Sequence, residues 1–167
     1  AAYSLIPTHL LSQAHLKIGR LLVCEMPAEQ HEEVIFDIVN QLNRGAQLIT
    51  EQEEREQLAR FNLIAGQRSH ASTAYDLALK YFITGAQLLD DPCWLRRHEL
   101  KFKLELNLAE CEFLTGQLLV ADQRLQALSE RALTIVEQGS VACMRMNVNL
   151  LLDRSDQAVA VCLSFLR

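Results

Sequence analysis

The sequence is poor in the residues that shape sheets and tight loops. Of its 167 residues only 6 are glycine and 3 are proline, and Phe, Tyr and Trp together make up 6%. Leu, Ala, Gln and Glu dominate instead, and these residues favour helices. The composition therefore predicts an all-α fold, and the length predicts a single domain.

An excess of positive charge is also missing. The chain carries 16 basic and 21 acidic side chains, for a formal net charge of -5. Because a nucleic-acid backbone binds to a positive field, this balance argues against DNA or RNA as a direct partner.

Cysteines are scattered and odd in number. No two of them have the C-x-x-C spacing, which argues against both a disulfide framework and a zinc site. We interpret all five as buried thiols in a reducing cytosol: Cys24, Cys93, Cys111, Cys143 and Cys162.

Long apolar runs are absent as well. No stretch approaches the roughly 18 consecutive apolar residues of a membrane-spanning helix. The first residues also lack the basic-then-apolar pattern of a signal peptide. The sequence therefore predicts a cytoplasmic location without direct membrane contact.

Motifs of catalysis and cofactor binding are missing too. No glycine-rich string leads into a lysine and a hydroxyl as in a P-loop, and no histidine has Glu three residues before it as in ferritin-like iron sites. Cys111 lies between Glu110 and Glu112, whose charges raise the pKa of a thiol, so we interpret it as a core residue. We expect no catalytic residue, metal or cofactor in this chain, which leaves a free-standing helical enzyme without support.

Apolar residues recur with helical spacing between short connections. Pro27 and Pro92 suit first helical turns, Thr50 and Glu53 have the spacing of a capping box, and five of the glycines lie near the ends of apolar runs. The short connections predict that neighbouring helices pack as antiparallel hairpins. We predict about eight helices: residues 8–24, 28–48, 51–66, 69–88, 92–115, 118–134, 138–152 and 155–166.

Small residues recur with the same spacing at three places in the sequence. We interpret each place as a helical hairpin, with the first residue of each set in its turn. The three copies are Gly66 with Ala71, Tyr75 and Ala78; Gly116 with Ala121, Leu125 and Leu128; and Asp153 with Ala158, Cys162 and Phe165. The pattern resembles the tetratricopeptide repeat, in which small residues let two helices approach closely. Because the copies are unevenly spaced, we predict an irregular superhelix.

Longer strings carry a further resemblance. They are "AAYSLIP", "HLKIGRLL", "IFDIVNQLNRGAQLI", "ASTAYDLALKYFITGAQLL" and "LAECEFLTG". Together they resemble the helical region that follows the ATPase module in very large bacterial and fungal signalling proteins. Those proteins combine a kinase-like domain, a STAND-type ATPase, this helical arm, a GAF sensor and often a histidine kinase.

The resemblance implies a non-catalytic helical arm of a hybrid sensor histidine kinase or a serine/threonine kinase. Residues 1–6 would be the tail of the ATPase's winged-helix part, and residues 7–167 would form one helical-repeat domain. The implied partners are the neighbouring ATPase and sensor or kinase domains, with a separate protein or peptide left open, and ATP would bind only to those other domains. The alternative is an inducer-sensing arm of a STAND-type transcriptional regulator.

Stacked hairpins would line a concave face with their first helices. The groove offsets of tetratricopeptide repeats place five polar residues there: Glu56, Arg60, Lys103, Glu110 and Asn147. This mixed set favours a peptide or polar ligand over a lipid, but idle exposed helix residues would look the same. The string "WLRRHELKFK", residues 94–103, is likewise either a surface for an anionic partner or the solvated face of a helix.

Because the chain lacks a phosphate-binding loop, we expect it to neither bind nor hydrolyse ATP. Titration calorimetry with magnesium-ATP should show no heat of binding. A micromolar site coupled to turnover would contradict this prediction.

Overall fold

The computed structural model describes residues 7, 10–27 and 30–166, and the predicted ATPase tail at residues 1–6 lies outside them. Within the described ranges there are eight helices of eleven residues or more and no strand, as the sequence predicts. A four-residue helix, α5, and the 3-10 turn η4 complete the order. The bounds are α1 Leu11–Glu25, α2 Ile35–Gly45, η4 Ala46–Leu48, α3 Gln52–Ala71, α4 Tyr75–Gln87, α5 Cys93–Arg96, α6 His98–Leu114, α7 Leu118–Ser129, α8 Ile135–Leu151 and α9 Ser155–Phe165.

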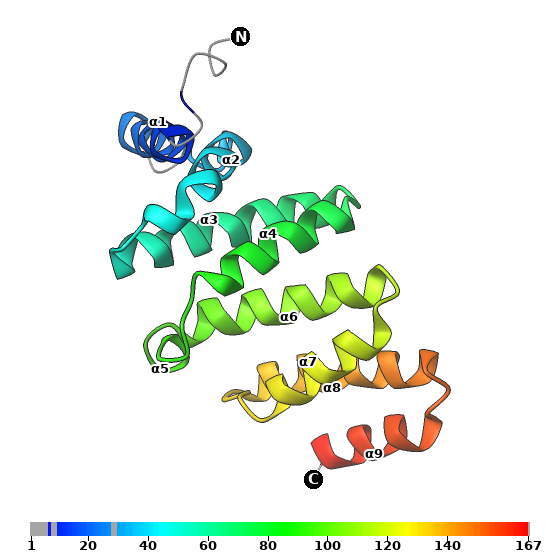
Figure 1. Ribbon diagram of the computed structural model, residues 1–167. Helices are drawn as coiled ribbons and strands as arrows, with labels where there is room; N and C mark the ends of the chain where they lie inside the picture. Colours follow the sequence, from blue (N-terminus) through cyan, green and yellow to red (C-terminus); the bar gives the residue numbers. More distant parts are fainter. Residues whose placement is uncertain (1–6, 8–9, 28–29, 167) are drawn as a thin grey trace.

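The long helices form four antiparallel hairpins that stack in chain order (Figure 1). The pairs are α1 with α2, α3 with α4, α6 with α7, and α8 with α9. Consecutive hairpins meet through α2 and α3, α4 and α6, and α7 and α8. The all-α stack of hairpins that the sequence predicts is therefore confirmed.

Three of the hairpins share one turn geometry. The turns contain Thr73, Gly116 and Asp153, with φ of 60°, 81° and 57°. In each, the next residue's backbone N–H donates to the carbonyl five residues earlier, at 2.9, 2.7 and 2.8 Å, which closes the preceding helix. Ala78, Ala121 and Ala158 follow these turn residues at the same offset, and all three are buried. The predicted turns at Gly116 and Asp153 are confirmed.

The predicted register of the first copy is wrong by seven residues. Gly66 lies inside α3, and the turn is at Thr73, so the equivalents of Ala121, Leu125 and Leu128 are Ala78, Phe82 and Gly85. Seven residues are close to two helical turns, so both registers place the same face of the helix toward its partner. The periodicity of the sequence does not distinguish them.

Gly66 has a packing role instead. A Cβ atom at this position would lie 2.3 Å from Cε1 of Phe82, which is fully buried on α4. The same close approach occurs between α1 and α2, a hairpin that the repeat spacing did not include. A Cβ on Gly19 of α1 would lie 2.4 Å from Cδ2 of Leu42 on α2. Close approach of the two helices depends on these missing side chains.

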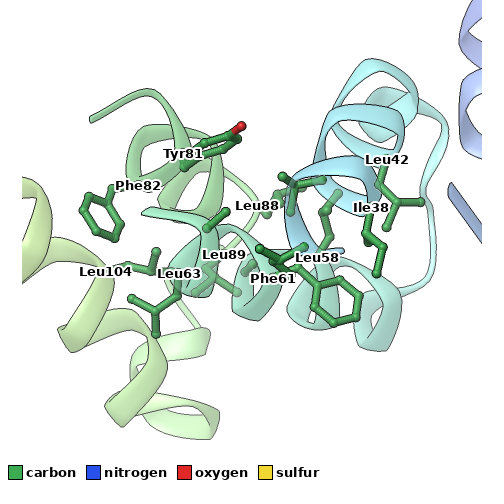
Figure 2. Packing of buried hydrophobic residues seen from close by; sticks show 14 of the residues in the cluster. Ile38, Leu42, Leu58, Phe61, Leu63, Tyr81, Phe82, Leu88, Leu89 and Leu104 are labelled. Carbon is green, nitrogen blue, oxygen red and sulfur yellow. The ribbon is translucent and has the colours of Figure 1, made fainter. Parts of the chain in front are cut away.

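The apolar core runs along the stack in two clusters. The larger joins the first two hairpins and includes Leu104 of α6, as Figure 2 shows for its labelled members. The smaller joins the last two hairpins around Leu125 and Val148. Within the described chain, no helix has the length and apolar character that crossing a membrane requires.

Two local predictions are corrected. Thr50 does not cap α3; the capping box lies at Thr134, whose side chain accepts a hydrogen bond from the backbone of Glu137 at the start of α8. Burial of all five cysteines is also wrong, because Cys24 and Cys143 are exposed and Cys162 is half-buried.

Gly66→Ala tests the approach of α3 to α4. A Gly→Ala change inside a helix normally raises stability by about 0.5 to 1 kcal/mol. Here the added methyl group meets the buried ring of Phe82, so we expect a loss of about 1 to 3 kcal/mol in chemical denaturation. Gln67→Ala, at an exposed neighbouring position, is the control and should stay within about 0.5 kcal/mol of the parent. A more stable Gly66→Ala variant would mean that the two helices do not meet here.

Candidate functional site

A basic hollow of about 410 Å³ lies where α3, α5 and α6 meet. Four of its lining residues are Lys or Arg and one is Glu, so the hollow is locally positive on a chain with a net charge of -5. A local field of this sign attracts anionic groups. The lining residues are Arg60, Leu63, Arg96, Arg97, His98, Glu99, Leu100 and Lys103.

A break in the chain between α5 and α6 forms one wall. The sequence predicts one helix over residues 92–115, but Arg97 has φ -137° and ψ 44°, which is not helical. The break lets Cys93 enter the larger core cluster while Trp94 packs against the smaller one. It also turns Arg97 toward α3, where Glu56 lies.

Glu56 lies beneath the hollow and not on its surface. Its side chain is 4% exposed, and Nε of Arg97 donates to its Oε2 at 2.5 Å. Gln52 Nε2 donates to its Oε1 at 3.3 Å. The hydrogen bond from Arg97 lowers the pKa of Glu56, although burial opposes it. Glu56 therefore fixes Arg97, and a ligand in the hollow would not meet this carboxylate.

Arg60 and Lys103, both predicted as binding residues, face the same hollow from different helices. Lys103 Nζ lies 2.6 Å from Glu99 Oε1, one turn earlier on α6. No carboxylate or other hydrogen-bond partner holds the Arg60 side chain in the part of the chain that the structure describes. Arg60 is therefore available to an incoming anion.

His98 closes the side of the hollow nearest the third and fourth hairpins. Its Nε2 lies 3.1 Å from Oε1 of Glu137, and its ring stacks on Phe102 with centroids 5.6 Å apart. Burial raises the pKa of Glu137, but hydrogen bonds from the backbone of Leu133 and Thr134, and from His98, outweigh this effect and lower it. This wall of the hollow is thus tied to the start of α8.

The other two predicted residues lie elsewhere. Glu110 is on α6, with Oε1 3.7 Å from Nε2 of His70, and Asn147 is exposed on α8. Neither lines the basic hollow. Conversely, the groove offsets missed Arg96, Arg97, His98 and Glu99. The signal for these residues was the basic string at 94–103, whose fold-back against α3 depends on the unpredicted break.

The described residues show no group of three His, Cys, Asp or Glu side chains that could hold a metal ion. Cys111 is buried as predicted, and burial, with the charges of Glu110 and Glu112, raises its pKa to about 11. A thiol in this state is protonated at neutral pH and is a poor nucleophile.

The chain is similar to one curated protein along most of its length. The chain is 28% identical over 178 residues to a Dictyostelium discoideum protein named hybrid signal transduction histidine kinase G. The alignment covers 93% of this chain but only 5% of that protein. No protein-family model matches the chain, and no solved structure matches it either. The similarity is weak but extends over most of the chain.

Glu56→Gln tests the ion pair beneath the hollow. Because the folded-state pKa of Glu56 is lowered, its stabilisation is complete above the ordinary glutamate pKa of about 4.3 and is lost as the pH falls through the lowered value. We expect the variant to be less stable at pH 7 by about 1 to 2 kcal/mol, since Arg97 is half exposed and the pair is partly screened.

Denaturation at pH 7 and at about pH 3 measures the effect, because the difference between parent and variant should shrink in acid. Glu53→Gln, at an exposed position one turn earlier on α3, is the control. An equal difference at both pH values would remove the charge of Glu56 from the explanation.

Proposed function

We propose that this chain is a non-catalytic helical-repeat arm of a multidomain signal-transduction protein of the histidine-kinase type. In this proposal the basic hollow docks an acidic segment of a neighbouring domain. The weak similarity to a hybrid histidine kinase and the stacked-hairpin architecture support it. The neighbouring ATPase and sensor or kinase domains, and the nucleotide that they bind, belong to the same proposal.

The observation that carries the proposal is the convergence of Arg60 and Lys103 on one hollow. A guanidinium group binds a carboxylate through two parallel hydrogen bonds, which gives geometric specificity as well as energy. Arg60 offers such a group without an internal partner, while Arg97 is already fixed by Glu56. Leu63 and Leu100 add an apolar floor, a combination that suits an acidic peptide segment with an apolar side chain.

The position of the hollow explains how docking would act on the rest of the molecule. It lies at the junction of the two core clusters, because its lining residue Leu63 belongs to the larger one and its lining residue His98 stacks on Phe102 of the smaller one. A segment bound between Arg60 on α3 and Lys103 on α6 bridges the second and third hairpins. Docking therefore biases the angle between the two halves of the arm, which sets the positions of the domains attached to it.

Charge reversal of the hollow tests the proposal in the natural protein. Arg60→Glu combined with Lys103→Glu should repel an acidic segment and change the phosphotransfer output. The melting behaviour of the arm should shift by no more than about 0.5 kcal/mol, because both side chains are exposed.

The matched control is Lys17→Glu with Lys80→Glu, two exposed lysines outside the hollow that change the net charge equally. The control should keep the parent output. Unchanged output in the Arg60 and Lys103 double variant would exclude the hollow from signalling and leave the arm as a spacer.

A further inference from the structure

A second hollow, of about 380 Å³, lies between α8, α9 and the end of α7. These helices form the C-terminal end of the stack in Figure 1. The walls of this hollow are mostly apolar, unlike those of the basic hollow. The lining residues are Ser129, Ile135, Gln138, Val141, Ala142, Arg145, Val161, Ser164 and Phe165.

Arg145 is the one charged side chain that lines this hollow. Its Nε is buried without a hydrogen-bond partner, and its Nη1 reaches only Ser129 Oγ, at 3.5 Å. Across residues 10–27 and 30–166, no carboxylate forms an ion pair with it. Arg145 therefore keeps an uncompensated positive charge at the edge of an apolar hollow, where an anionic group would stabilise it.

Two neighbouring arginines, in contrast, pair with carboxylates. Arg124 on α7 is held between Glu105 and Glu112, with Nη2 2.9 Å from Glu112 Oε1. Arg154 pairs with Asp122 at 3.0 Å. Arg145 lacks such a carboxylate although its Nε is buried, and the space in front of it is a hollow of ligand size.

We propose that this hollow binds a medium-chain aliphatic carboxylate. The carboxylate accepts hydrogen bonds from the two Nη groups of Arg145, in the two-pronged geometry that guanidinium groups favour. The aliphatic chain lies against Val141, Val161 and Phe165. The volume is in the lower part of the range for small-molecule sites, which fits a chain of roughly ten carbons. This site is independent of the basic hollow and of the arm's proposed docking role.

Titration calorimetry with sodium decanoate, below its micelle concentration, tests the proposal on the complete 167-residue chain. Decanol has the same chain without the charge, and acetate has the charge without the chain. We expect decanoate to bind, decanol to bind at least about tenfold more weakly, and acetate not to bind, because charge-assisted hydrogen bonds and apolar contact are both required.

Two variants locate the site. Arg145→Met keeps the length and apolar stem of the side chain, so it should fold and should lose about tenfold or more in decanoate affinity without weakening decanol. Ala142→Trp should fill the hollow and abolish the binding of both decanoate and decanol. Arg60→Glu, in the basic hollow, is the control and should leave the affinities for decanoate and decanol unchanged.

Three results would overturn the proposal: equal binding of decanoate and decanol, decanoate binding that survives Arg145→Met, or no decanoate binding at millimolar concentration. If decanoate fails while an acidic helical peptide binds and loses affinity in Arg145→Met, the hollow is a protein-docking groove and the small-ligand assignment is wrong.

Discussion

The ring of Phe82 occupies the space that a side chain on residue 66 would fill, and the second hairpin depends on this contact. Because α3 and α4 approach so closely, Gly85 on α4 can also receive Leu104 of α6, where a Cβ would lie 2.8 Å from Cδ2 of that leucine. The position of α6 against α3 follows from these two contacts. Arg60 and Lys103 face the same hollow only because α3 and α6 are held in this relation.

The sequence was sufficient for the number of helices and for two of the turns, because apolar periodicity and the spacing of small residues repeat along the chain. It failed at Gly66, since a shift of seven residues preserves the helix face. The same shift explains the choice of Glu56: offsets taken two turns too early selected a residue near the start of α3, where Arg97 covers it. The break at Arg97 was equally invisible, because residues 93–104 contain no glycine or proline that would mark the end of a helix.

Polar contacts join the two core clusters where apolar packing changes from one to the other. Glu56 holds Arg97 beneath the basic hollow, while Glu137 accepts hydrogen bonds from its own capping box and from His98. Lys101 is buried between them, and its Nζ donates to the carbonyls of Leu89 and Asp90 at 3.0 and 2.8 Å. Directional bonds of this kind fix the angle between elements more narrowly than apolar contact does. The junction therefore combines the hollow with buried polar contacts that fix the elements around it.

The larger helix contacts all lie within one hairpin or between hairpins that are neighbours in the stack. In mechanical terms, each interface between hairpins can bend slightly, and the bending at successive interfaces adds along the arm. A rotation of a few degrees where α2 meets α3 swings everything beyond it, and the displacement grows with distance from the pivot. A molecule built in this way converts a small angular change near one end into a large translation at the other end.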